Sequence, residues 1–269
     1  MSMYKSILRI EDLELSFKMY EGMSKVLKKI SLELNRGEKV ALVGESGSGK
    51  SVTTKLILGL LDQKNVYKKG KIIFEERDIL NLPEKEFKKI RGNNISIIFQ
   101  DPMAALNPVF KIKDQFHEVN LNNNKKISKK ESHFIACEAL KKVSIRDPER
   151  VMESYPFQLS GGIAQRVVIT MAMINEPALL LADEPSTALD VTIQNQALDL
   201  MDELTSKTNT AVLLITHNMG VVRKFAEKVY VIYRGVIVEE GSKKQIFENP
   251  GHPYTKALLD AIPKLSGEG

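Results

Sequence analysis

Residues 44–51 read Gly44-Glu45-Ser46-Gly47-Ser48-Gly49-Lys50-Ser51 and match the pattern G-x-x-x-x-G-K-[ST] at every fixed position. The apolar run Val40–Val43 precedes this stretch, and a segment with helical spacing from Val52 to Leu60 follows it. Between a strand and a helix, such a loop binds phosphate, because its glycines let backbone N–H groups converge on an anion. An ordinary glycine-rich turn would not need all the fixed positions. We therefore expect Lys50 to reach the β- and γ-phosphates of a nucleotide and Ser51 to hold Mg²⁺.

Length and composition set the class of protein. The 269 residues, 43% of them hydrophobic, fit one large α/β domain or a core with a subdomain. No apolar run approaches the roughly 18 residues of a membrane span, and the N-terminus lacks the apolar segment of a signal peptide. One cysteine, Cys137, allows no internal disulfide and no cysteine-built metal cluster, which fits a reducing compartment. We expect Cys137 to be a small buried hydrophobe.

The net charge of +5, with a pI near 9.0, comes partly from the basic stretch 124–130. A basic run of this kind can contact nucleic acid or anionic lipid, but it is more often a solvated loop, and no aromatic residues are interleaved with it. We therefore expect no nucleic-acid partner.

Four apolar runs each end at a polar residue suited to phosphate chemistry. They are Val40–Val43 before the phosphate loop, Ile95–Phe99 before Gln100, Ala178–Ala182 before Asp183 and Glu184, and Val212–Thr216 before His217. Near-continuous apolar runs of this length are typical of parallel strands buried on both faces. Ligands bind at the carboxyl ends of such strands, so the four endings are expected to face one site.

The remaining segments predict a less uniform arrangement around this core. Residues 8–17 and 71–74 show the alternation of half-exposed antiparallel strands, and residues 229–239 predict a hairpin that turns at Arg234-Gly235. Residues 101–174 are mainly helical and are interrupted by prolines. We expect this middle part to be a subdomain inserted between two strands of the core.

The strand-end residues have the chemistry that phosphoryl transfer requires, which is mainly positioning and charge neutralisation. Asp183 is expected to bind Mg²⁺, and Glu184 to orient and polarise the attacking water. Gln100 could contact the water or the metal, and His217 could hydrogen-bond the γ-phosphate. Taken singly, each of these residues could be an ordinary solvated or structural side chain. Their pairing with the phosphate loop makes the catalytic interpretation the stronger one.

A second anion-binding helix start follows Leu159. Ser160 is a suitable N-cap, and Gly161 and Gly162 permit the close approach of a phosphate. A plain helix cap is the simpler alternative. It does not explain why a chain with one phosphate loop carries a second helix start of this kind.

From about Leu8 to its end, the chain resembles the ATP-binding subunits of ABC transporters. The motifs occur in family order: Walker A (Gly44–Ser51), the Q-loop (Gln100), the signature (Leu159–Gly162), Walker B (Leu179–Asp183, then Glu184), the D-loop (Ser186–Asp190) and the switch histidine (His217). The resemblance implies an α/β fold: a P-loop NTPase core with a mainly parallel sheet, an N-terminal antiparallel β-subdomain and an inserted α-helical subdomain. It implies one domain over 1–269, with a core of about 1–100 and 175–269 and a signature subdomain of 101–174.

The same resemblance implies ATP and Mg²⁺ as cofactors and a head-to-tail dimer in which the signature of one subunit closes over ATP held by another. Its catalytic residues are Lys50, Gln100, Glu184 and His217, and its metal ligands Ser51, Gln100 and Asp183. An aromatic residue stacks on adenine in the family, and Phe17 is in that position, with Tyr20 as the alternative. The nucleotide-binding set is Phe17, Gly44, Glu45, Ser46, Gly47, Ser48, Gly49, Lys50, Ser51, Val52, Ser160, Gly161 and Gly162.

Two further stretches resemble the oligopeptide, dipeptide and nickel importer ATPases. They are Phe99–Val109, with its Leu106-Asn107-Pro108-Val109, and the tail from Ile246 to Thr255, with its His252-Pro253-Tyr254-Thr255. There are departures, because Ile163 stands where Gln or Met is usual and Asn218 where Asp is common. Many peptide importers continue into a cysteine-rich tail. Such cysteines are lacking up to Gly269, so nickel or another small solute stays open as the transported substrate.

This resemblance implies an ATP-driven motor on the cytoplasmic face of the cell membrane, most simply for oligopeptides or dipeptides. Its partners are two integral-membrane permeases, a second ATPase subunit that is identical or different and, indirectly, an extracytoplasmic solute-binding protein. The segment Asp101–Phe110 is expected to face the permease, with Leu106 as a contact outside the nucleotide site. The alternatives are a soluble ABC ATPase, against which the absence of a coiled-coil insertion and of a second cassette argues, and an inactive regulatory subunit, against which the complete catalytic set argues.

Overall fold

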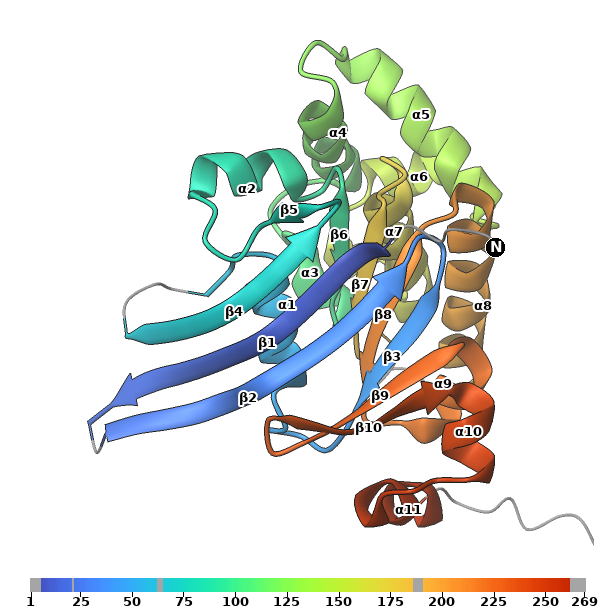
Figure 1. Ribbon diagram of the computed structural model, residues 1–269. Helices are drawn as coiled ribbons and strands as arrows, with labels where there is room; N and C mark the ends of the chain where they lie inside the picture. Colours follow the sequence, from blue (N-terminus) through green and yellow to red (C-terminus); the bar gives the residue numbers. More distant parts are fainter. Residues whose placement is uncertain (1–5, 21, 62–64, 186–190, 262–269) are drawn as a thin grey trace, which may run out of the picture. The chain divides into compact units, whose positions relative to one another are not determined.

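The computed structural model describes residues 6–20, 22–61, 65–185 and 191–261 (Figure 1). The chain divides into two compact units, one formed by residues 1–82 with 213–269 and the other by residues 83–212. Within the described residues, no helix combines the length and the apolar character needed to cross a lipid bilayer.

The first unit contains a four-stranded antiparallel sheet. Its strand order is β2 (Gly22–Asn35), β1 (Ser6–Met19), β4 (Val66–Phe74) and β5 (Arg77–Asp78). In β1 the buried residues Leu8 and Ile10 are followed by Leu13 and Leu15, so the alternation slips by one residue. A register shift between Ile10 and Leu13, with Asp12 at φ 45°, absorbs this slip and keeps all four leucine and isoleucine side chains on the buried face.

Strand β2 was not predicted from the sequence. Its buried residues Leu27 and Ile30 are three positions apart, and Lys29 between them has a φ of 61°. The bulge interrupts the two-residue period on which the sequence argument depended. The strands predicted at residues 8–17 and 71–74 are present in β1 and β4.

The first unit also carries the strand that leads into the phosphate loop. Strand β3 (Lys39–Val43) is buried at every residue and pairs in parallel with β9 (Lys228–Tyr233). Strand β9 forms the predicted hairpin with β10 (Val236–Ser242), and β8 (Ala211–Thr216) neighbours β3 on its other side. The helices of this unit are α1 (Lys50–Ile57), α9 (Met219–Phe225), α10 (Lys243–Glu248) and α11 (Pro253–Asp260).

The second unit contains two short strands that pair in parallel, and most of its other elements are helices. Strand β6 (Ile95–Ile98) lies beside β7 (Leu179–Asp183), with Ile98 opposite Ala182. The helical segments are α2 (Glu84–Ile90), α3 (Pro102–Ala105), α4 (Ile112–Asn123), α5 (Lys129–Lys142), α6 (Pro148–Glu153), the 3₁₀ turn η1 (Pro156–Gln158), α7 (Gly161–Met173) and α8 (Val191–Thr208). Segments α3 to α7 occupy the stretch between β6 and β7, as the sequence predicted. The division at 101–174 into a signature subdomain stays a prediction.

All four apolar runs form strands, namely β3, β6, β7 and β8. Buried residues dominate each of them, and β3 and β8 are buried throughout. The fold is therefore of the predicted α/β class, with a P-loop NTPase core and a separate antiparallel sheet.

Candidate active site

The phosphate loop follows β3 and leads directly into α1. Gly49 is the N-cap of α1 and has a φ of 109°, and Gly47 has a φ of 79°, so both use the left-handed region that favours glycine. At Gly44 the requirement is steric, because an added Cβ would lie 2.1 Å from the carbonyl oxygen of Ile232. The glycines of the motif therefore allow a tight loop whose backbone N–H groups turn inward ahead of the helix.

The side chain of Lys50 bends back over this loop. Lys50 is only 5% exposed, and its Nζ donates to the carbonyl oxygens of Gly44 and Glu45, each at 2.7 Å. Burial of an ammonium is costly unless it has such partners. The two carbonyl groups therefore fix a positive charge at the mouth of the loop.

Ser48 connects the loop to the β9–β10 hairpin. Its carbonyl oxygen accepts from the N–H of Gly235 at 3.0 Å, and the carbonyl oxygen of Gly235 accepts from Lys28 of β2 at 2.8 Å. Gly235 has a φ of 81°, and an added Cβ would lie 2.2 Å from the carbonyl oxygen of Val26. The Oγ of Ser48 is buried and has no hydrogen-bond partner within the described ranges. A buried hydroxyl of this kind is suited to donate to a ligand oxygen.

Tyr254 of α11 also contacts the phosphate loop, which the sequence analysis did not foresee. Its hydroxyl accepts from the backbone N–H of Glu45 at 2.8 Å, and its ring lies against that of Tyr233 with the centroids 4.2 Å apart. Burial raises the pKa of the Tyr254 phenol, so the hydroxyl is neutral. The carboxylate of Glu239 accepts from the N–H groups of Gly251 and His252 at 2.6 and 3.0 Å and fixes the start of this helix. The stretch His252–Thr255 thus supports the phosphate loop.

Removal of the Tyr254 hydroxyl tests this support. We expect Tyr254→Phe to bind ATP roughly fivefold more weakly, because a lost intramolecular hydrogen bond costs about 1 kcal/mol. The measurement is a titration with nucleotide and Mg²⁺. Tyr67→Phe, on a residue of β4 that is 56% exposed, is the matched control and is expected to bind normally. Equal affinities for the two variants would show that the bond to Glu45 has no influence on the loop.

Phe17 lies near the end of β1, where it is opposite Ser24 of β2 and is half-buried. Two residues further along, β2 passes the phosphate loop: a Cβ added to Gly49 would lie 2.6 Å from Leu27 Cδ2 and 3.5 Å from the oxygen of Val26. Tyr20, the alternative aromatic residue, is fully exposed. Phe17 is therefore on strands that flank the loop, and its stacking role stays a prediction.

The second unit positions two predicted catalytic residues and one predicted metal ligand at one end of paired strands. Gln100 comes shortly after β6. Asp183 is the last residue of β7, and Glu184 comes directly after it. Because β6 and β7 are parallel and in register, these side chains come at the same sheet edge, as predicted. Glu184 has a φ of 49°, which is unusual for a residue with a side chain. The Nε2 of the buried Gln165 donates to the next carbonyl oxygen, that of Pro185, at 3.0 Å.

The signature residues form the start of α7. Ser160 is the N-cap, and its hydroxyl accepts from the N–H of Ile163 at 3.4 Å. Ser160 and Gly161 are exposed and Gly162 is half-buried. The first-turn N–H groups of this 13-residue helix are thus at the surface, as an anion site requires. The D-loop, residues 186–190, lies outside the described residues.

His217 is exposed directly after β8, the strand that neighbours β3. The next residue, Asn218, caps α9, since its Oδ1 accepts from the N–H groups of Gly220 and Val221 at 2.8 and 3.3 Å. Asparagine and aspartate are equivalent as N-caps. The departure from the common aspartate therefore keeps an N-cap at the start of α9.

Comparison with known proteins identifies the family. A family model described as ABC transporter matches residues 27–187, and one described as the C-terminal region of oligopeptide/dipeptide transporters matches residues 238–269. The chain is 46% identical to the dipeptide transport ATP-binding protein DppD of Lactococcus lactis subsp. cremoris, over 97% of this chain and 75% of that protein. It is 47% identical to the oligopeptide transport ATP-binding protein OppD of Bacillus subtilis, over 98% and 74%.

Solved structures give the same result. The ATP-binding cassette MJ0796, in a dimeric post-hydrolysis state bound to ADP and Pi, has a TM-score of 0.77 at 29% identity and covers 88% of this chain and 98% of its own. The protein cbiO1 from Clostridium perfringens, part of an ABC transporter complex, has a TM-score of 0.73 at 26% identity, over 91% of each chain. The chain therefore belongs to the ABC transporter family, as an ATP-binding and ATP-hydrolysing subunit of the oligopeptide and dipeptide transporter group.

Proposed function

We propose that this chain is the motor of a peptide importer and that ATP binds with its phosphates in the loop 44–51. The observation that carries the proposal is the buried Lys50, whose ammonium is held by the carbonyl oxygens of Gly44 and Glu45 in a glycine-rich loop. A fixed cation together with backbone donors fits a polyphosphate and has no obvious purpose without one. The buried Oγ of Ser48, which has no hydrogen-bond partner among the described residues, adds a donor to the same loop.

Mg²⁺ fits the oxygen donors that we assign to it. Ser51 is exposed in the first turn of α1, and Asp183 and Gln100 stand at the ends of β7 and β6. A hydroxyl, a carboxylate and an amide oxygen are ligands of the kind that Mg²⁺ prefers. When bound, the ion neutralises phosphate charge.

Hydrolysis is assigned to the side chains around this ion. Glu184 accepts the proton of the attacking water, and Gln100 positions that water. Lys50 and His217 stabilise the charge on the γ-phosphate. Phe17 stacks on the adenine.

A second ATPase subunit would complete each site. Ser160, Gly161 and Gly162 present helix N–H groups at the surface, and we assign them to the γ-phosphate of ATP held by a partner chain, identical or different. The related cassette MJ0796 was solved as a dimer. A head-to-tail dimer would also explain why one chain carries two helix N-termini suited to binding phosphate.

The membrane partners are inferred from the relatives. Their names, dipeptide and oligopeptide transport ATP-binding protein, support peptides over nickel as the transported class. We assign this chain to the cytoplasmic face of the cell membrane, with two permease subunits and, outside, a solute-binding protein. The test is uptake of labelled dipeptides and oligopeptides into vesicles reconstituted with the complete transporter, with and without internal ATP. ATP-independent uptake, or no peptide uptake beside active nickel uptake, would refute the assignment.

The permease contact requires a correction to the sequence-based choice of residue. Leu106 is only 3% exposed, so it is buried, and an aspartate there would disturb the fold. Val109 and Phe110, later in the same segment, are 71% and 52% exposed. These two side chains are the better candidates for an apolar contact with a permease.

We therefore expect Val109→Asp to leave ATP binding by the isolated subunit unchanged and to lower peptide uptake by the reconstituted transporter at least roughly tenfold. A charge placed in an apolar interface removes more than about 1.4 kcal/mol of contact energy. The measurements are co-purification with the permeases and vesicle uptake. The control is Phe134→Asp, at an apolar residue of the same unit that is 66% exposed. Normal assembly and uptake for Val109→Asp would place the permease contact elsewhere.

A further inference from the structure

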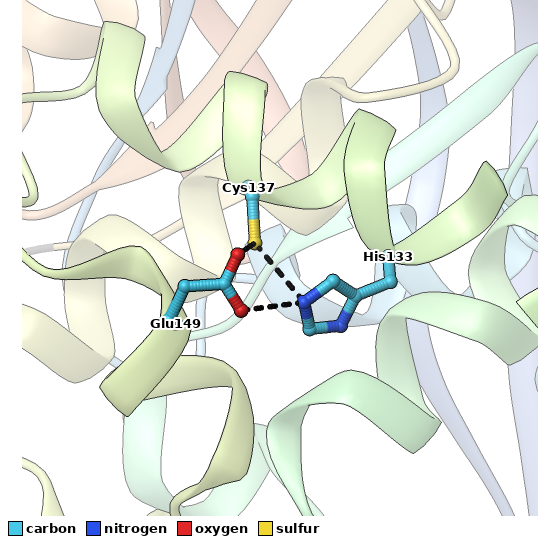
Figure 2. A group of neighbouring side chains, drawn as sticks. All are labelled: His133, Cys137 and Glu149. Atoms are coloured by element: carbon cyan, nitrogen blue, oxygen red, sulfur yellow. Dashed lines mark hydrogen bonds and ion pairs between the residues drawn. The ribbon is translucent and has the colours of Figure 1, made fainter. Parts of the chain in front are cut away.

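Three potential metal ligands, none of them assigned to ATP, come together in the second unit. His133 and Cys137 are on α5, and Glu149 is on α6 (Figure 2). The Nε2 of His133 lies 2.7 Å from Oε2 of Glu149, and the Sγ of Cys137 lies 3.5 Å from that Nε2 and 3.5 Å from Oε1 of Glu149. One ligand atom of each residue lies within 4.8 Å of the others.

The helices fix this triangle. His133 and Cys137 are four residues apart, so they share one face of α5 and point toward the first turn of α6. The side chain of Asp147 caps that turn by accepting from the N–H of Arg150 at 3.1 Å, which orients Glu149. Preorganised ligands of this kind lower the cost of binding an ion.

The separations agree with those in a tetrahedral zinc shell. With bonds of roughly 2.3 Å to sulfur and 2.05 Å to nitrogen or oxygen, the sulfur lies about 3.6 Å from each of the other two ligands, which are about 3.3 Å apart. The two sulfur distances of 3.5 Å already match. Oε1 of Glu149 is therefore the oxygen placed to bind the ion, and the hydrogen bond of 2.7 Å between Oε2 and Nε2 of His133 has to open. The side chain of Glu149 is 71% exposed and able to turn.

We propose that His133, Cys137 and Glu149 bind one Zn²⁺ ion through Nε2, Sγ and a carboxylate oxygen, with the fourth position taken by a solvent molecule. A thiolate, an imidazole and a carboxylate are the ligand types that zinc takes. Mg²⁺ and Ca²⁺ prefer oxygen-only sites, so this cluster discriminates against the ion used with ATP.

Charge balance is consistent with a divalent ion. Without an ion, the Cys137 thiol donates to the Glu149 carboxylate. Zinc displaces the thiol proton to solvent, and the thiolate and carboxylate together neutralise the ion. Nearby, Lys141 and Glu138 form an ion pair at 2.7 Å, so they add little net charge at the site.

Bound zinc would tie α5 to α6. These helices are joined only through residues 143–147 along the chain, and α6 has just six residues. An ion that binds the folded state but not the unfolded one raises stability in proportion to the logarithm of its concentration. The proposed role is therefore structural, and it does not depend on ATP.

The test uses the full chain, free of nucleotide and of any polyhistidine tag. Calorimetric titration with Zn²⁺ is expected to give one ion per chain, and Co²⁺ is expected to give a thiolate-to-metal charge-transfer band in the near ultraviolet. Because Cys137 is the only cysteine of the chain, such a band identifies it directly. Zn²⁺ is also expected to raise the melting temperature.

Variants separate the site from adventitious binding. Cys137→Ser should lose the cobalt band, and Glu149→Gln should weaken zinc binding at least about tenfold, the lower end of the effect of disturbing a metal site. Glu138→Gln, on the same helix but outside the triangle, is the control and should bind like the wild type. No band in the wild type, or equal zinc affinity in Glu149→Gln, would overturn the proposal. Glu149 is exposed, so this second variant decides the question even if Cys137→Ser fails to fold.

Discussion

Glu184→Gln is expected to bind ATP with near wild-type affinity and to hydrolyse it at least roughly 100-fold more slowly. Glutamine keeps the shape and the hydrogen-bonding capacity of the side chain but cannot accept the proton of the attacking water, and general-base catalysis typically contributes a factor of 10² to 10⁴. Lys50 and the loop N–H groups, which we assign to the phosphates, are unchanged. Because hydrolysis is blocked after binding, the variant should also accumulate as an ATP-bound dimer.

The measurements are single-turnover hydrolysis and the molecular mass in the presence of ATP. Glu176→Gln is a suitable control, because Glu176 is an exposed glutamate of the same unit with a similar φ of 47°. It should hydrolyse ATP at the wild-type rate. Wild-type turnover by Glu184→Gln would move the catalytic role elsewhere, with His217 as the next residue to test.

Lys50→Ala is expected to abolish hydrolysis and to weaken ATP binding by roughly 10- to 150-fold. A hydrogen bond to a charged group is worth about 1.5–3 kcal/mol, and we assign the Lys50 ammonium directly to the β- and γ-phosphates. The substitution also leaves the carbonyl oxygens of Gly44 and Glu45 without the donor that now bridges them. Loss of affinity is therefore expected from both the ligand and the loop.

The control for this variant is on the same helix. Lys55→Ala removes an equal charge from an exposed position one turn further along α1 and should leave ATP affinity unchanged. Titration with ATP and Mg²⁺ compares the two variants, and circular dichroism checks that both are folded. Unaltered binding by Lys50→Ala would exclude the loop as the phosphate site.

The sequence was most informative where local chemistry and local structure coincide. The phosphate loop, the four apolar strands and the polar residues at their ends were predictable because each depends on neighbours in the chain, such as Gly49 before α1 or Ser160 before α7. The cap formed by Asn218 belongs to the same class, although the sequence analysis noted that residue only as a departure from the family.

Features that depend on distant residues were not predictable. Strand β2 escapes prediction because the bulge at Lys29 breaks its alternation, and the burial of Leu106 depends on tertiary packing that the local sequence does not show. Cys137 is buried, as expected, but only folding brings Glu149 beside it. Tyr254 reaches Glu45 across 209 residues, and no local pattern contains that information.

This last contact has a consequence for protein synthesis. The phosphate loop is translated well before two of its supports, Gly235 and Tyr254. At about 5–20 residues per second, the 209 residues between Glu45 and Tyr254 take roughly 10–40 s to translate. During that interval a nascent chain carries the complete Walker A sequence without the hydrogen bonds that brace it. The phosphate loop is therefore fully braced only after Tyr254 has been translated and α11 has folded.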